Sequence, residues 1–172
     1  MAVLFAFSSA GSQSPATSPP SDPAEEKDTY EVYSQVLRDR SPSVETWRIV
    51  QETKPFPFCL KPAQDLAPIY QPVLDGYSIK NKSKLTLERK FGLFAYVMVS
   101  PQEYWGRAPS TNLVTFSAVG FNKDRTRAGV CYSVGNSAGS SGTCLLLVRQ
   151  DGNWKGNSDI RQGCGFGGAV YF

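Results

Sequence analysis

The sequence of 172 residues contains no histidine. A Ser–His–Asp triad, a Cys–His pair and the zinc sites that use histidine ligands therefore cannot be built from this chain alone. Switching by imidazole protonation near neutral pH is excluded for the same reason. The lack of histidine therefore restricts the possible functions more than any motif in the chain does.

Charge and long apolar runs are also scarce. Charged residues make up 19% of the chain, which is low for a soluble protein. The net charge of +3 is too small to indicate a nucleic-acid partner. After the apolar stretch of residues 1–10, no segment reaches the ~18 consecutive apolar residues that a membrane span needs. We therefore expect neither nucleic-acid binding nor a membrane span.

The motifs that would indicate a cofactor or a metal lack their structural context. The glycines of 163–168 superficially resemble a dinucleotide-binding turn, but that chemistry needs a helix directly after the glycines. Only four residues follow them in this sequence. Cys-x-x-Cys spacing does not occur either, so the sequence predicts no cofactor and no metal site.

The composition that is present predicts one globular domain with many turns. Apolar residues account for 41% of the chain, and 12 prolines and 15 glycines favour turns over a helical bundle. Residues 1–10 form an apolar stretch ending in Ser8, Ser9 and Ala10, and a Ser/Pro-rich linker follows. This resembles the end of a secretory signal peptide.

The basic part of such a signal is missing, so either the start codon was assigned too far downstream or the segment is a disordered tail. We expect 1–22 to be a truncated signal-like segment and linker, and 23–172 to be a single domain. The predicted location is secreted or periplasmic.

Capping residues and periodicity predict an early helix over 24–39. Asp22 is a suitable N-cap, Pro23 fits the first helical position, and Glu25 is an acid in the first turn. The apolar stripe of this helix consists of Tyr30, Tyr33, Val36 and Leu37.

Strand composition marks five segments. The segment 46–53 is β-branched and aromatic, and 91–100 is a continuous apolar run that predicts a strand buried on both faces. The last three, 113–121, 126–134 and 143–149, are separated by turn-like residues and predict consecutive antiparallel strands.

Between the strands, proline and glycine indicate irregular structure. Prolines exclude a central strand from 54–62, and they reduce 63–74 to at most a helical turn. A capping signature at Ser100 predicts a short helix, and 135–142 reads as a flexible loop. A possible terminal strand spans 169–172. The predicted fold is α+β, with the N-terminal helix packed on an antiparallel β-meander sheet.

Four cysteines in an exported chain are expected to pair, with three possible connectivities. The hairpin register that places Cys131 opposite Cys144 favours a disulfide between them, which leaves Cys59 and Cys164 to each other. The alternative is that all four are reduced, buried thiols.

Candidate chemical groups are numerous but unspecific. Glycoside chemistry would need two carboxylates across a cleft, and Glu52 with Glu103 is one such pair. The acidic candidates are Glu45, Glu52, Asp65, Asp75, Glu88 and Glu103. The aromatic residues that could line a glycan or peptide groove, or form core, are Trp47, Tyr70, Tyr77, Tyr104, Trp105 and Trp154. The basic run, a solvated face or an anion-binding patch, consists of Lys80, Lys82, Lys84, Arg89 and Lys90.

Six short motifs occur in an order that resembles a group of small exported bacterial proteins of unknown function, acidobacterial ones among them. The motifs are YEVYSQVL at 30–37, IVQET at 49–53, FSAVGFN at 116–122, AGVCY at 128–132, LLLV at 145–148 and DGNWK at 151–155. The resemblance implies export and an α+β architecture, and no catalytic residue. The proline-rich middle and the glycine-dense end depart from it.

The leading functional hypothesis is a non-enzymatic domain that binds a protein or glycan partner in the bacterial envelope or outside the cell. The alternative is a histidine-free hydrolase with paired carboxylates. A thiol-dependent redox function is a third possibility.

Overall fold

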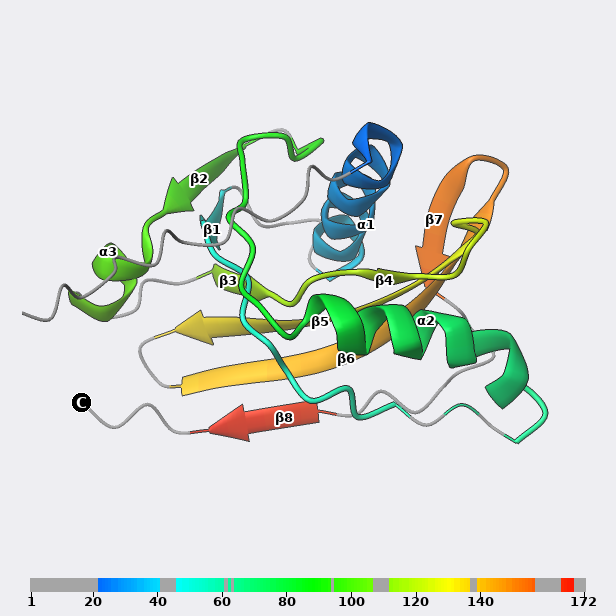
Figure 1. Cartoon of the computed structure of the whole chain (residues 1–172). Coiled ribbons are helices and arrows are strands. Elements are labelled where there is room, and N and C mark those ends of the chain that lie inside the picture. Colours follow the sequence, from blue (N-terminus) through cyan, green and yellow to red (C-terminus); the bar gives the residue numbers. More distant parts are fainter. Residues whose placement is uncertain are drawn as a thin grey trace, which may run out of the picture.

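The computed structural model describes residues 22–40, 46–60, 62, 64–93, 95–106, 112–136, 139–156 and 165–168. These form one mixed sheet with α1 on one face and α2 on the other (Figure 1). The elements are α1 (Pro23–Arg40), β1 (Trp47–Val50), α2 (Ala67–Lys80), β2 (Tyr96–Val99), α3 (Pro101–Gly106), β3 (Leu113–Phe116), β4 (Gly120–Phe121), β5 (Arg127–Asn136), β6 (Gly139–Gln150), β7 (Asn153–Gly156) and β8 (Gly165–Gly168). The strand order is β2-β1-β3-β5-β6-β7, with β4 on β5 and β8 on β6.

Helix α1 confirms the first predicted element. The Asp22 carboxylate accepts a hydrogen bond of 3.0 Å from the Ala24 N–H, as an N-cap does, and Pro23 begins the helix. The apolar stripe predicted from the sequence is buried throughout: Tyr30, Tyr33, Val36 and Leu37.

The sheet corrects the antiparallel prediction, because β1 pairs in parallel with both β2 and β3. Parallel neighbours need a long crossover connection, and the chain between β1 and β2 contains α2. Composition identifies a strand without its direction. The direction depends on whether the connecting chain crosses back along the sheet before the next strand begins.

The three predicted C-terminal strands are antiparallel neighbours, because β3 and β4 both pair with β5, and β5 pairs with β6. Strand β7 continues this meander on the other side of β6. Strands β5 and β6 are longer than expected and pair as far as Asn136 and Gly139, so most of the predicted loop 135–142 is ladder. Asp151 and Gly152 join β6 to β7 with positive φ at both positions, as a two-residue hairpin turn requires. Strand β8 lies at 165–168, whereas the predicted terminal strand 169–172 lies outside the described residues.

The predicted strand 113–121 is interrupted after Phe116. Asn81, just after α2, receives a hydrogen bond of 2.9 Å from the Ala118 N–H and donates one of 3.1 Å to the Ala118 carbonyl. The Ala118 backbone groups therefore bond the Asn81 side chain. The strand resumes at Gly120, where α2 lies directly against the backbone.

The prediction of irregular structure over 63–74 is wrong, because α2 begins at Ala67 and includes Pro72. Pro72 lacks the N–H that would bond the Pro68 carbonyl, but this loss falls near the start of the helix. Tyr70, Val73 and Tyr77 are buried against the sheet, and this burial outweighs the local cost of proline.

The run 91–100 is likewise a shorter element than its composition predicts. Only Tyr96–Val99 forms a strand, β2, and it lies at the end of the strand order. Val97 is 48% exposed, so the strand is not buried on both faces. Phe91 belongs to the core without being in a strand.

Alternation along β5 and β6 divides the interior into two clusters. Val130, Tyr132 and Leu147 face α1, whereas Cys131 and Leu146 face α2. None of the helices among the described residues is long and apolar enough to cross a membrane.

Candidate functional site

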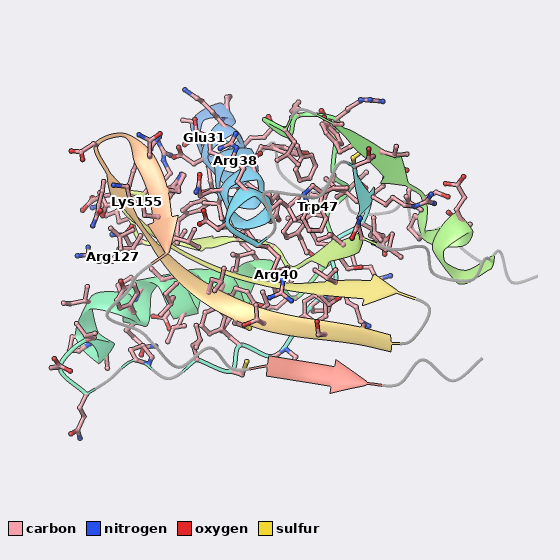
Figure 2. The ribbon with its side chains drawn as sticks, turned by 180° about the vertical axis from the view of Figure 1, so that it is seen from behind. Glu31, Arg38, Arg40, Trp47, Arg127 and Lys155 are labelled. Carbon is pink, nitrogen blue, oxygen red and sulfur yellow. A yellow bond between two sulfur atoms is a disulfide. The ribbon has the colours of Figure 1, made fainter. Side chains whose placement is uncertain are left out.

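A surface pocket of about 500 Å³ lies along the outer side of α1. Its walls are the chain around Lys90 and Gly92 and the tip of the β6–β7 hairpin. Figure 2 shows Glu31 and Arg38 on α1, with the hairpin that carries Lys155 beside the helix. The residues lining it are Pro23, Glu26, Lys27, Tyr30, Glu31, Ser34, Gln35, Arg38, Lys90, Gly92, Gly152, Asn153 and Trp154.

One wall is held to α1 by hydrogen bonds from the loop backbone. The Tyr30 hydroxyl accepts a bond of 2.6 Å from the Glu88 N–H, and Ser34 Oγ accepts one of 2.9 Å from the Gly92 N–H. Arg38 donates to the Gly92 carbonyl. Burial raises the pKa of the Tyr30 phenol, so this hydroxyl stays protonated at neutral pH.

Two ion pairs that share Lys90 form the rim of the same wall. Lys90 Nζ lies 2.7 Å from carboxylate oxygens of both Glu26 and Glu88. Hydrogen bonds to these two carboxylates raise the pKa of Lys90, and Glu26 has the larger effect. Lys90 is therefore a permanent cation. Glu26 and Lys90 line the pocket, so it carries both signs of charge.

The opposite wall ends at Trp154, the one buried aromatic of the hairpin tip. Its side chain is 2% exposed, and its ring packs 5.7 Å from Phe121, centroid to centroid. The Arg149 guanidinium lies 5.4 Å from the indole centroid. Within the described part of the chain, the buried Trp154 Nε1–H has no hydrogen-bond acceptor. A buried donor without an acceptor costs about 1–3 kcal/mol, which a bound acceptor would recover.

The Trp154 backbone is also oriented outward. Gln150 and Asn153 flank the two-residue turn and form the hydrogen-bonded pair, so the next pair, Arg149 with Trp154, points its peptide groups away from each other. The Arg149 N–H accordingly donates to Thr126 on the other side, at 2.9 Å. The Trp154 N–H and carbonyl therefore face the outer edge of β7, which in the described ranges pairs with β6 alone.

A buried carboxylate beneath the hairpin fixes its position against α1. Asp28, 4% exposed, lies 3.0 Å from Arg125 Nε and 2.9 Å from Arg149 Nη1. Arg149 also reaches Glu31 at 3.1 Å. The pocket wall therefore has an ionic anchor in α1, and the sequence analysis did not identify Asp28 as part of a site.

The predicted carboxylate pair does not line the pocket. Glu52 forms an ion pair of 2.5 Å with Lys84, and Glu103 accepts a 3.0 Å bond from the Ser100 N–H at the start of α3. Of the other candidates, Glu88 holds Lys90 and Asp75 accepts a bond from Gln71. Asp65 is exposed, and Glu45 lies outside the described residues.

The aromatic candidates are also not gathered in one place. Trp47, Tyr70 and Tyr77 are buried in the core, and Trp154 alone of the described ones lines the pocket. The side chains of Tyr104 and Trp105 are outside the described set. The basic run is dispersed: Lys80 pairs with Glu25, Lys84 with Glu52, and Arg89 lies over Tyr96, while Lys82 is exposed.

Cys131 and Cys144 are direct partners in the β5–β6 ladder and form a disulfide. Cys59 is also disulfide-bonded, and its predicted partner Cys164 lies outside the described residues. In the described ranges, groups of acidic and cysteine side chains that could hold a metal ion are not found.

Comparisons with known proteins return no relative. The chain matches no protein-family model, no curated protein and no solved structure. The resemblance to small exported bacterial proteins therefore stays a prediction.

Proposed function

We propose that this protein is a non-enzymatic binding domain of the bacterial envelope or extracellular space, and that its pocket along α1 binds an extended peptide segment of a partner protein. The observation that carries the proposal is Trp154. Trp154 lines the pocket, and its buried indole N–H has no acceptor among the described residues.

An extended peptide would supply an acceptor for the Trp154 indole N–H, which has none within the described part of the chain. Its carbonyl groups can accept from the indole N–H, and its backbone can pair with the outward peptide groups of Trp154 on β7, the mode known as strand addition. Rim charges of both signs, Glu26 and Lys27 among them, favour a segment of mixed charge. The disulfide in the described core agrees with an oxidising compartment.

The test is a selection of peptides from a random library displayed on phage, with the whole protein as bait. Selected peptides are then titrated by calorimetry against the wild type and Trp154→Phe. We expect binding that weakens about tenfold in the variant, the equivalent of one lost hydrogen bond. Lys27→Glu, an exposed rim change, should shift the preferred peptide charge without altering the fold.

The matched control is Ile79→Ser, an exposed change on α2 at the opposite face, which should leave affinity unchanged. Selection of no peptide contradicts the proposal. So does a peptide whose affinity is the same for the wild type, Trp154→Phe and Lys27→Glu.

A further inference from the structure

Three sulfur atoms meet on the α2 face of the sheet, away from the pocket. Cys59 Sγ lies 3.6 Å from Cys144 Sγ, and Cys144 is bonded to Cys131. Cys59 belongs to a disulfide of its own. Two disulfides are therefore in van der Waals contact through the Cys59 and Cys144 sulfurs.

The contact is held by the proline-rich segment that lies across the sheet. The Tyr77 hydroxyl donates a bond of 2.8 Å to the Phe56 carbonyl, and the Phe58 ring packs against Tyr77 at 4.7 Å between centroids. Cys144 Sγ lies 3.8 Å from the Pro57 carbonyl oxygen. The segment therefore keeps Cys59 over Cys144.

The cysteines differ in their access to solvent. Cys131 and Cys144 are fully buried, at 0% exposure, whereas Cys59 is partly exposed. A reductant in solution reaches the disulfide of Cys59 first. The Cys131–Cys144 bond is reached only through local opening or through Cys59 itself.

We propose that Cys59 transfers reducing equivalents from an external dithiol to the buried Cys131–Cys144 disulfide. The dithiol reduces the disulfide of Cys59 by two exchange steps and becomes a disulfide itself, which leaves a Cys59 thiolate and one further protein thiol. The Cys59 thiolate attacks Cys144 Sγ. The Cys144–Cys131 bond breaks, Cys131 leaves with the electron pair and takes up a proton, and a Cys59–Cys144 disulfide forms.

The physical basis is proximity. An attacking sulfur already in contact with its target needs no diffusional encounter, so exchange competes with release of the segment. The surroundings are apolar, with Leu60, Tyr70 and Leu146 in the same cluster. The thiolate is the attacking species in disulfide exchange, so the transfer accelerates as pH rises.

The first test uses the whole oxidised protein with one equivalent of dithiothreitol under native conditions. Thiols are blocked with N-ethylmaleimide, and a proteolytic digest is mapped by mass spectrometry. The expected product is a peptide pair joined through Cys59 and Cys144, with the blocking group on Cys131. An intact Cys131–Cys144 bond beside a blocked Cys59 overturns the proposal.

The second test measures the reduction rate of the Cys131–Cys144 bond with excess dithiothreitol. Cys59→Ser is combined with Cys164→Ser so that no odd thiol is introduced. We expect reduction at least about tenfold slower in this variant, because the intramolecular attacker is missing. Equal rates overturn the proposal. Should the variant not fold, the mapping of the wild-type protein decides alone.

Discussion

The two faces of the sheet are each covered by one helix, but different interactions stabilise the two faces. On the α1 face, the aromatic rings of Tyr33 and Phe116 pack against each other, and Asp28 is buried with two arginines. On the α2 face, the backbone of α2 lies against Gly120, and a disulfide links β5 to β6. Side-chain packing leaves room for a pocket beside α1. On the α2 face, the helix backbone lies directly against the backbone of β4 at Gly120.

The largest loss of stability is expected at Gly120, where the backbone of β4 lies against the backbone of α2. A Cβ at Gly120 would lie 2.4 Å from the Tyr77 nitrogen and 2.5 Å from the Val73 carbonyl oxygen. These atoms belong to the helix backbone and cannot turn aside, so Gly120→Ala should destabilise the fold by about 3 kcal/mol or more. Urea denaturation followed by circular dichroism measures the change.

The control is Gly156→Ala on β7, where a Cβ would meet nothing within 4 Å. Its free energy of unfolding should be close to that of the wild type. If both alanine variants are equally stable, α2 is not in close contact with β4, and the proposed difference between the faces fails.

The next effect concerns the ionic anchor on the α1 face. Asp28→Asn removes the charge that two arginines share, and each arginine is about a third exposed and can recover hydration. We therefore expect the free energy of unfolding to fall by about 2–3 kcal/mol. Breaking a fully buried ion pair costs more, about 3–5 kcal/mol. Thermal unfolding checks this. Glu31 pairs with Arg149 on its exposed side. Glu31→Gln should therefore change the free energy of unfolding by less than about 0.5 kcal/mol.

A smaller effect is expected at the hydroxyl that links α1 to the interrupted strand. The Tyr33 hydroxyl donates a buried hydrogen bond of 2.7 Å to the Ser117 carbonyl, and burial raises the pKa of this phenol far above its ordinary value. Tyr33→Phe leaves the carbonyl unpaired and should cost about 1–2 kcal/mol. Tyr96→Phe is the control, because within the described residues its hydroxyl has no hydrogen bond. Equal losses in chemical denaturation would contradict the role of Tyr33.

The smallest effect is a pH dependence at the start of α1. The hydrogen bond from the Ala24 N–H, and then the Arg125 guanidinium, lower the pKa of Asp22 below its ordinary value. The carboxylate therefore stabilises the folded state above the unfolded pKa of about 3.9, and this contribution disappears as pH falls through the folded pKa. Asp22→Asn should melt slightly lower than the wild type near neutral pH. The melting temperatures should converge in acid, and a difference that grows in acid would contradict this.

Local signals predicted the parts of the structure that depend on neighbours in the sequence. The N-cap at Asp22 and the stripe through Tyr33 act over a few residues, and they place α1 within one residue of its observed ends. Alternation along 126–134, together with the hairpin, set Cys131 opposite Cys144. The predicted loop 135–142 did not determine this register. One cysteine on each predicted strand favoured the register that joins them, and the structure confirms it.

Features that depend on distant contacts could not be predicted in this way. Helix α2 includes Pro72 because Tyr70, Val73 and Tyr77 are buried against the sheet. The parallel pairing of β1 depends on the crossover through α2. The pocket is formed by α1, the loop at Lys90 and the β7 hairpin, which are far apart in the sequence. No local signal shows that they meet, although the tryptophan after the Asp151–Gly152 turn is a visible clue.

The sequence alone therefore determined the early helix, the C-terminal meander, its cysteine register and the absence of histidine chemistry. Each of these depends on residue type or on spacing along a few residues. Only the tertiary structure decided the mixed sheet, the place of α2, the burial of the Trp154 indole and the contact between Cys59 and Cys144. These depend on which distant segments are packed together, and burial free energy, summed over the whole chain, decides that.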